Sequence, residues 1–386
     1  MKKLLYVTGS RAEYGIMKRL LSALMHDEDV DLSIVATGMH CEEKYGLTYK
    51  QIESDGFCLH KRIPIDIDTT NNAAILASMS LCQTQFGQYF HDHPYDAVML
   101  LGDRYEILPV AIAAAMHNLP IIHLHGGEKT LGNYDEFIRH AITKMSKLHL
   151  ASTETYRKRI IQLGENPASV FNIGALGAEN SLSLPLPTKS ALSTKFGSLD
   201  KPYFMVVFHP ETLNDFPLSR QIEELLSALY QLKDQYDFIF IGSNSDTGSN
   251  EITEKIRLFC HHNQFRFMTS ISPEEYLSLI KYSQGLVGNS SSGLIEVPSL
   301  LVPTINIGDR QKGRVKGDTV IDCRCEEKDI YQAVVLSQSE TFQNLLAIST
   351  NPYFQDNVLE AALEKIKCFL SSEPIKYKDF YDLNPS

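Results

Sequence analysis

The sequence has no long hydrophobic segment. No run of residues approaches the roughly 18 apolar residues that a membrane-spanning helix requires. The N-terminal segment Met1–Gly9 starts as a secretory signal does, with lysines and an apolar run, but the run ends after about five residues. We therefore expect no membrane partner and a cytoplasmic location.

The sequence also lacks an excess of positive charge. It has 36 lysines and arginines against 47 aspartates and glutamates among 386 residues, which gives a net charge of −11. Because a nucleic-acid surface needs a basic field, we expect no nucleic-acid partner. A local cationic pocket for phosphate is still compatible with this composition.

Cysteine is sparse and scattered. Among the seven cysteines, Cys323 and Cys325 form the only close pair, and no second pair lies at the spacing of zinc ligands. We expect reduced, buried thiols and no structural zinc.

Short apolar segments alternate with helical patterns along the whole chain. Most of the short segments are continuous apolar runs, which are typical of strands buried on both faces of a parallel sheet. We predict strands at Leu4–Thr8, Leu32–Ala36, Ala97–Leu101, Ile121–His125, Leu148–Ser152, Val170–Ile173, Phe204–Phe208, Phe238–Ile241, Phe265–Met268, Gly285–Val287 and Thr304–Ile307. We predict helices at Tyr14–Met25, Ala73–Phe90, Ile107–His117, Glu136–Lys147, Glu154–Leu163, Arg220–Leu232, Glu251–His261, Pro273–Lys281, Ile330–Ser337 and Asn357–Ser371.

The chain is too long for one ordinary core, so we expect two doubly wound α/β domains that face a shared cleft. The glycine- and proline-containing stretch Gly174–Lys189 is the predicted boundary. The predicted units are residues 1–176, residues 177–353, and residues 354–386, whose helix crosses back onto the first domain.

Three carboxylates follow predicted strands in the first half: Asp103, Glu128 and Asp135. Ligands bind at the strand ends of open α/β sheets, so we interpret these acids as functional. Asp103 has the structural alternative of capping the next helix, which leaves the adjacent Arg104 unexplained. Asp135 has the alternative of an i,i+4 ion pair with Arg139; in the functional interpretation Arg139 orients Asp135 or contacts substrate.

Glu128 follows two glycines that permit a tight turn beside a ligand, and it has no obvious structural role. His123 and His125 lie just before it on one face of a strand. A metal at these three residues is conceivable, but buried or hydrogen-bonded histidines are the favoured interpretation.

A second group of residues indicates an anion site. Val7–Gly15 is a strand, a glycine turn and a helix start, although the dinucleotide pattern G-x-G-x-x-G is missing. Arg11 at this turn is either a phosphate clamp or an ordinary surface arginine. In the second half, His209 ends a strand and can donate a proton or hold a phosphate.

The segment Val287–Val297 has the same strand, turn and helix pattern, with serine hydroxyls and free N–H groups in the turn. Glu296, inside the new helix, is placed to accept from the hydroxyls of a ribose. Gly308–Arg314 adds a cationic loop at the next strand end. The residues alone thus predict a two-domain enzyme that binds a nucleotide-linked ligand in its cleft.

Together these segments resemble the hydrolysing UDP-N-acetylglucosamine 2-epimerases, specifically those of bacterial sialic-acid capsule synthesis. The similarity covers essentially the whole chain. The matching segments are Val7–Gly15, Thr37–His40, Leu101–Glu106, Gly126–Ser146, His209–Leu213, Gly288–Glu296 and Gly308–Arg314.

The resemblance implies a GT-B-like fold, no cofactor or metal, and a homo-oligomer, either a dimer or a tetramer. It implies conversion of UDP-N-acetylglucosamine and water to N-acetylmannosamine and UDP. The implied catalytic residues are Asp103, Glu128, Asp135 and His209. The implied substrate and nucleotide contacts are Arg11, Arg104, Arg139, Asn244, Ile271 (through its backbone), Ser290, Ser291, Glu296 and Arg310.

The implied reaction explains the need for several acids. The C2 proton of a sugar is only weakly acidic, so its removal must accompany loss of UDP, which gives 2-acetamidoglucal. Water then adds across the double bond in the opposite stereochemical sense. We expect Glu128 or Asp103 to act as the base of elimination and Asp135 to act in hydration, with their order left open.

Three alternatives remain at the level of the sequence. A non-hydrolysing epimerase re-adds UDP to the glucal, and that branch usually has glutamate at the position of Asp135. A GT-B glycosyltransferase uses an acceptor in place of water, and a nucleotide-sugar sensor would have no activity. GDP in place of UDP is also open, because related enzymes act on GDP-linked sugar.

Overall fold

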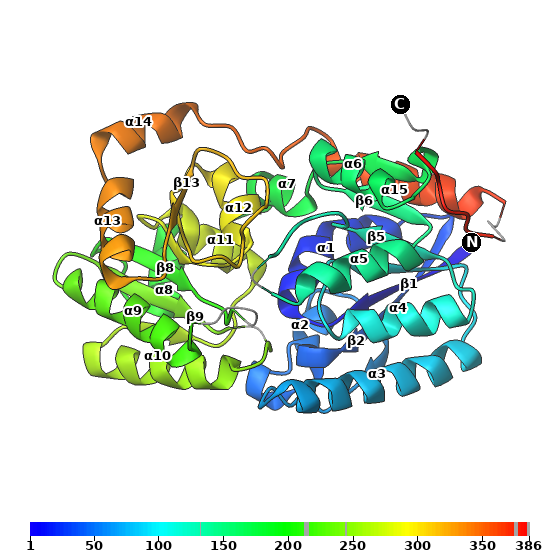
Figure 1. The fold of residues 1–386 in the computed structure, drawn as a ribbon, viewed down its shortest axis with the longest axis horizontal. Coiled ribbons are helices and arrows are strands. Elements are labelled where there is room, and N and C mark those ends of the chain that lie inside the picture. The colour runs from blue at the N-terminus through cyan, green and yellow to red at the C-terminus, as the bar shows by residue number, and fades with distance from the viewer. Residues whose placement is uncertain (132, 212–215, 244, 374–376, 384–386) are drawn as a thin grey trace.

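The computed structural model describes residues 1–131, 133–211, 216–243, 245–373 and 377–383. Two parallel sheets, each covered by helices on both faces, form two domains that lie side by side (Figure 1). Within the described ranges no helix is both long and apolar enough to cross a membrane. The predicted pair of doubly wound α/β domains is confirmed.

The first domain contains a seven-stranded parallel sheet in the order β3-β2-β1-β4-β5-β6-β7. The direction of winding reverses between β1 and β4, which is where such sheets bind ligands. The strands are β1 Lys2–Thr8, β2 Val30–Thr37, β3 Leu59–Ile63, β4 Ala97–Leu101, β5 Ile121–Leu124, β6 Leu148–Ala151 and β7 Val170–Asn172.

Polar residues at the helix starts fix several helices of this domain. The side chains of Ser10, Asn71 and Thr153 each accept a hydrogen bond from a backbone N–H in the first turn of α1, α3 and α6 respectively. The helices are α1 Arg11–Met25, α2 Tyr49–Ser54, α3 Asn72–Asp92, α4 Ile107–Met116, α5 Asp135–Met145, α6 Glu154–Gln162 and α7 Leu176–Ser183, with 3-10 turns at Gly38–Cys41, Glu43–Tyr45 and Pro167–Ser169.

The second domain repeats the topology with six parallel strands in the order β10-β9-β8-β11-β12-β13, so its winding reverses between β8 and β11. The strands are β8 Tyr203–Val207, β9 Asp237–Ile241, β10 Arg266–Met268, β11 Leu286–Gly288, β12 Thr304–Ile307 and β13 Val320–Cys323. The helices are α8 Lys189–Phe196, α9 Leu218–Gln231, α10 Ser249–Asn263, α11 Pro273–Lys281, α12 Ser292–Ile295, α13 Glu327–Ser337 and α14 Glu340–Ile348, with a 3-10 turn at Val297–Leu300.

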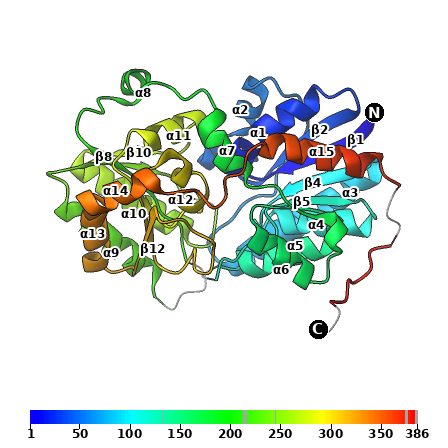
Figure 2. The ribbon, with the colours of Figure 1, turned by 90° about the horizontal axis from the view of Figure 1, so that it is seen from above.

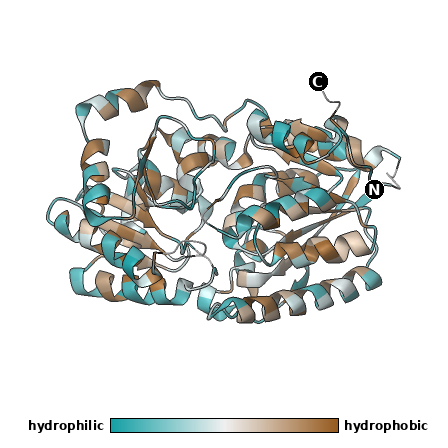
Figure 3. Cartoon of the chain, in the orientation of Figure 1, coloured by the Kyte–Doolittle hydropathy of each residue, from teal (hydrophilic) through white to brown (hydrophobic). Residues whose placement is uncertain are grey.

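Each sheet has an apolar core on both faces. Successive side chains of a strand point to opposite sides, and helices cover both sides. In β1, Leu4 and Tyr6 pack under α1, whereas Leu5 and Val7 pack under α3 and α4. The second sheet is divided in the same way between its two cores. Figure 3 shows the apolar strands inside and the polar outer faces of the helices.

The last helix, α15 Val358–Ser371, returns to the first domain and lies along α1 and α7 (Figure 2). Its buried residues Val358, Ala362, Ile366 and Leu370 recur every four positions and join the core under α1. Each large aliphatic side chain buried there contributes about 2 kcal/mol. The domain boundaries at 176/177 and 353/354 stay predictions, and α7 packs against both domains where the first of them falls.

The two strands that were not predicted from the sequence lie at sheet edges. Strands β3 and β13 end the two sheets, and their middle residues are partly or fully exposed, so they have no apolar run to detect. The helices α2, α7, α8 and α14 were also not predicted, whereas the helix predicted after the serine turn is present as the single turn α12. The expectation of buried thiols is wrong for five cysteines, because only Cys82 and Cys260 are buried.

Candidate functional site

A cleft lies between the domains at the carboxyl ends of the central strands of both sheets. Among its lining residues are twelve of the thirteen predicted site residues, and Asn244 lies outside the described residues. The twelve are Arg11, Asp103, Arg104, Glu128, Asp135, Arg139, His209, Ile271, Ser290, Ser291, Glu296 and Arg310. The structure thus brings these residues together, while their individual roles stay predictions.

Two glycines let the backbone turn tightly at the cleft. Gly127, between β5 and Glu128, has a φ of +75°, and a Cβ there would lie 2.6 Å from the Tyr156 carbonyl oxygen. Gly288, at the end of β11, has a φ of +141°, and a Cβ there would lie 1.9 Å from the Val207 carbonyl oxygen. Neither position accepts a larger residue without a shift of the backbone.

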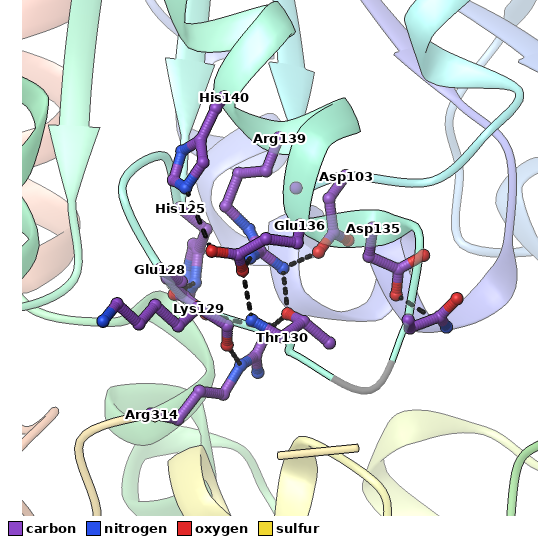
Figure 4. Close-up of polar contacts among 12 residues, drawn as sticks. Asp103, His125, Glu128, Lys129, Thr130, Asp135, Glu136, Arg139, His140 and Arg314 are labelled. Atoms are coloured by element: carbon purple, nitrogen blue, oxygen red, sulfur yellow. Dashed lines mark hydrogen bonds and ion pairs between the residues drawn. The ribbon is translucent and has the colours of Figure 1, made fainter. Parts of the chain in front are cut away.

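Asp103 forms an ion pair with Arg139, which reaches it from α5 (Figure 4). Arg139 is fully buried and also donates to Thr130 Oγ1 at 2.8 Å. Burial, together with the neighbouring Arg314, lowers the pKa of Arg139, so the Asp103 carboxylate supplies the counter-charge that this guanidinium needs.

The structure corrects two sequence-based interpretations, one for Asp103 and one for Asp135. Asp103 does not cap α4, because that helix begins at Ile107 with Glu106 at its N-cap and no side-chain cap. Asp135 pairs with Arg310, and Arg139 pairs with Asp103 and Glu136, so the alternative of an Asp135–Arg139 pair is wrong. Arg139 orients Asp103, not Asp135.

Glu128 is buried and accepts from three sides. His125 Nδ1 donates to Oε1 at 2.9 Å, Ser152 Oγ donates to the same oxygen at 2.8 Å, and the Arg314 guanidinium lies 3.1 Å from Oε2. Burial acts to raise the pKa of Glu128, but Arg314 and His125 outweigh it and lower this pKa to about 2. Glu128 is therefore ionised at neutral pH.

Asp135, at the first turn of α5, is buried in a different charge environment. Its Oδ2 lies 3.5 Å from Arg310 Nη2, and the same nitrogen lies 3.7 Å from Asp246 Oδ2. Burial and the Asp246 carboxylate raise the pKa of Asp135 well above its usual range, against the opposing effect of Arg310. Two acids in one cleft thus have pKa values shifted in opposite directions, as acid and base pairs in active sites often do.

Arg104 lines the cleft and is held in place by buried acids. Its Nε donates to Glu106 Oε1 at 2.5 Å, and its Nη2 donates to Ser245 Oγ of the second domain at 2.5 Å. Glu106 and the neighbouring Glu13 are both buried, and burial together with Glu106 raises the pKa of Glu13. Arg104 therefore balances a buried acidic cluster and connects the two domains.

The second domain lines the other side of the cleft. Arg11 crosses from α1 and donates to the backbone carbonyl of Ile271, so two predicted nucleotide contacts touch each other. Ser290 precedes α12, which is a single turn, and Glu296 lies at the end of this turn and not inside a longer helix as predicted. Burial raises the pKa of Glu296 to about 7, and its Oε2 accepts no hydrogen bond from the described residues.

His209 follows β8 and is fixed through its backbone. Its N–H donates to Asn289 Oδ1 at 2.7 Å, Asn289 Nδ2 donates to the His209 carbonyl at 2.9 Å, and its Nδ1 lies 3.0 Å from Ser243 Oγ. Burial, and then Arg310 and Arg104, lower the pKa of His209 well below its usual value. The imidazole is therefore neutral at physiological pH.

The histidines before Glu128 are hydrogen-bonded, as the favoured interpretation predicted. His123 lies 2.7 Å through Nε2 from the Gly102 carbonyl and 3.2 Å through Nδ1 from Thr143 Oγ1. His125 has a left-handed backbone with a φ of +62°, which costs about 1–2 kcal/mol and aims its ring at Glu128. Among the described residues no group of three or more acids, histidines and cysteines is arranged to hold a metal ion.

Three features of the site were not predicted from the sequence. Arg314 lay in the cationic loop that was identified, but only Arg310 of that loop was selected. Asp246 lies five residues after β9, the same strand-end position that singled out the acids of the first domain. The support of Arg104 by Glu13 had no sequence signal, because these two residues lie far apart along the chain and meet only in the folded domain.

Comparisons with known proteins agree with this geometry. The model of the family described as UDP-N-acetylglucosamine 2-epimerase matches residues 22–367. The polysialic acid biosynthesis protein P7 of Escherichia coli is 60% identical over 99% of this chain and 98% of its own. The GDP/UDP-N,N'-diacetylbacillosamine 2-epimerase (hydrolyzing) of Campylobacter jejuni is 39% identical over 89% of each chain.

A solved structure has the same fold. The UDP-GlcNAc 2-epimerase from Neisseria meningitidis bound to UDP-GlcNAc matches 95% of this chain and 100% of its own, with a TM-score of 0.79 and 16% identity. At that identity the likeness establishes the GT-B-like fold alone.

Proposed function

The chain belongs to the UDP-N-acetylglucosamine 2-epimerase family, and from this we propose that it hydrolyses UDP-N-acetylglucosamine to N-acetylmannosamine and UDP for sialic-acid synthesis. The observation that carries the proposal is the cleft itself, in which three acids of the first domain face the arginines and serines of the second. The names of two relatives, one for polysialic acid biosynthesis and one for a hydrolysing 2-epimerase, support it.

We assign nucleotide binding to the second domain. The serine-containing turn at Ser290 and Ser291 offers hydroxyls and N–H groups to phosphate, and Arg310 offers positive charge. Glu296, with an oxygen that accepts no hydrogen bond from the described residues, is suited to the ribose hydroxyls. Arg11 closes this subsite from the first domain, and neutral His209 hydrogen-bonds the diphosphate.

The first step is an elimination. A carboxylate, Glu128 or Asp103, accepts the C2 proton, and the electron pair of the C2–H bond forms the C1=C2 double bond. The C1–O bond breaks at the same time, and UDP leaves with its electron pair, stabilised by the arginines. Glu128 suits this role because it is ionised at neutral pH, and Asp103 is oriented for it by Arg139.

The second step is a hydration of the 2-acetamidoglucal. A proton is added at C2 from the opposite face, the oxygen of water bonds to C1, and the carboxylate left after the donation accepts the proton that the water loses, which gives N-acetylmannosamine. Asp135 suits the donation because burial and Asp246 keep a proton on it to higher pH than usual. The order in which Asp103 and Glu128 act is not part of the proposal.

Incubation of the protein with UDP-N-acetylglucosamine alone, followed by 1H and 31P NMR, tests this function. We expect free UDP and N-acetylmannosamine in equal amounts. UDP-N-acetylmannosamine as the sole product would replace the proposal with the non-hydrolysing reaction. Turnover only after addition of a sugar acceptor would replace it with a glycosyltransferase.

Rates measured side by side with the UDP-linked and the GDP-linked sugar test which nucleobase the enzyme prefers. We expect the UDP sugar to be preferred, and equal rates would contradict that preference. The homo-oligomer and the cytoplasmic location stay predictions.

A further inference from the structure

Glu128 receives its counter-charge from the other domain. Arg314, in the loop after β12, lies 3.1 Å from Glu128 Oε2. The same guanidinium donates to the Lys129 carbonyl at 3.0 Å and lies within 3.4 Å of Thr130 Oγ1. Arg314 thus binds three successive residues of the first domain, and one of them is the ionised acid.

The backbone next to Arg314 is fixed on the first domain. The Val315 N–H donates to Tyr156 Oη at 2.8 Å, and Tyr353 Oη donates to the Val315 carbonyl at 2.8 Å. The two tyrosine hydroxyls lie 2.8 Å apart, and both side chains are fully buried. The position of Arg314 is therefore set by a buried contact and not by an exposed ion pair.

Asp135 shares its counter-cation with a second acid. The single Arg310 guanidinium lies 3.5 Å from Asp135 and 3.7 Å from Asp246, and all three side chains are buried. Arg310 is held there because its N–H and that of Asp309 donate to Glu211 Oε1 at 3.1 and 2.8 Å. One guanidinium cannot balance two buried carboxylates, so this group favours keeping one proton.

Other charged groups face the two acids, and they do not reverse the difference in protonation between Glu128 and Asp135. Besides Arg314, Glu128 is faced by His125, which stabilises its charge, and by Glu296. Tyr156 and Tyr353 complete its surroundings. Asp135 is faced by Asp246 and Arg310, and more weakly by Arg104 and Arg314. Its neighbour Tyr134 keeps its own proton, because burial and then Asp246 raise the pKa of the phenol.

We propose that the second domain gives the two acids opposite protonation states: Arg314 holds Glu128 as a carboxylate, and Asp246 keeps a proton on Asp135. This deepens the proposed function and rests on it for its chemical meaning, because a base and an acid are then ready in the same closed cleft. Arg314 and Asp246 act as positioning residues through Glu128 and Asp135.

Asp246→Asn tests the second half of the proposal, because it removes a charge at nearly constant volume. Protein labelled with 13C at its aspartate and glutamate carboxyls is titrated by NMR, and the Asp135 signal is identified by its loss in Asp135→Asn. We expect the Asp135 midpoint to fall by about one pH unit. Asp309→Asn, a matched change on an exposed residue beside Arg310, should leave it in place. An unchanged or higher midpoint in Asp246→Asn overturns the assignment.

Arg314→Gln tests the first half. Without the cation, burial dominates, and the Glu128 midpoint should rise by about two pH units. Arg314→Lys keeps the charge but cannot make the three contacts of the guanidinium. If Arg314 acts through charge, the midpoint in Arg314→Lys stays near that of the wild-type protein. If both variants shift it equally, the role is structural and the proposal is wrong.

The same variants are then assayed across pH. With hydration needing protonated Asp135, the alkaline limb of kcat should move to lower pH in Asp246→Asn. With elimination needing ionised Glu128, the acid limb should move to higher pH in Arg314→Gln. A wild-type protein that does not turn over UDP-N-acetylglucosamine overturns the proposed function, whereas the NMR titration still decides the protonation states. The two failures are therefore distinguishable.

Discussion

The two walls of the cleft have one topology and different chemistry. Each domain places its functional residues at the point where its winding reverses, between β1 and β4 in the first domain and between β8 and β11 in the second. The wall of the first domain carries the three predicted catalytic carboxylates Asp103, Glu128 and Asp135, whereas that of the second carries serines, a histidine and two arginines beside its own acids Asp246 and Glu296. The sheet sets where a ligand binds, and the loops after the strands decide what is done to it.

The difference also shows that neither wall is complete alone. Asp103 has its arginine in its own domain, but Glu128 and Asp135 meet theirs only across the cleft. If this division of labour is correct, changes to the acids of the first wall should lower kcat, and changes to the nucleotide contacts of the second wall should raise KM, whereas Arg314 and Asp246 act on kcat through the acids they face.

Glu128→Gln should have the largest effect. It removes the ionised carboxylate and keeps the size of the side chain, so we expect kcat with UDP-N-acetylglucosamine to fall about 1,000-fold. UDP binding, measured by calorimetry, should change less than about threefold. Glu154→Gln, on an exposed glutamate at the start of α6, is the matched control and should retain full activity. Normal turnover in Glu128→Gln would remove Glu128 from catalysis and would favour a different base.

Arg139→Met should have the second-largest effect, which is a loss of stability. The buried guanidinium is the partner of Asp103, and its loss leaves that acid without its counter-charge. We expect the free energy of unfolding in urea to fall by about 3 kcal/mol. Arg324→Met, which removes an exposed arginine with similar ion pairs on the surface, should cost less than about 1 kcal/mol. Equal losses would mean that the Asp103–Arg139 pair is not specially important to the first wall.

The sequence predicted the parts of the fold that depend on burial. Central strands such as β1 and β8 are continuous apolar runs, and every one of the eleven predicted strands corresponds to a strand in the structure. The edge strands β3 and β13 escaped because a strand with one free edge and exposed residues has no such run. Short helices such as α2, of six residues, are below what hydrophobic periodicity can detect.

The site was predictable as a set of positions and not as a set of pairs. Strand ends identified Asp103, Glu128 and Asp135, but local spacing suggested that Arg139 pairs with Asp135, and it pairs with Asp103 instead. The arginine partners of Glu128 and Asp135 lie far along the chain in another domain, and no local pattern encodes such a contact. The pKa shifts follow from those partners, so they too become visible only in the folded protein.

Ser290→Ala tests the second wall and should have a smaller effect than either change in the first. If its hydroxyl binds phosphate, the loss of one hydrogen bond to a charged group should raise KM for UDP-N-acetylglucosamine about tenfold. The value of kcat should stay within about threefold. Ser190→Ala, on an exposed face of α8, is the control. A fall in kcat at constant KM would contradict the division between the walls.

Asn72→Ala should have the smallest effect, because it removes a contact at the exposed rim of the cleft. Thr247 Oγ1 donates to Asn72 Oδ1 at 3.0 Å, and the nearby Gly248 N–H bond to the Thr69 carbonyl does not depend on that side chain. An exposed hydrogen bond contributes at most about 0.5 kcal/mol net, so KM should rise no more than about twofold. The double variant Asn72→Ala with Thr247→Val separates this pair from other contacts of Thr247. If Asn72→Ala raised KM as much as Ser290→Ala does, the contrast between the walls would no longer explain substrate binding.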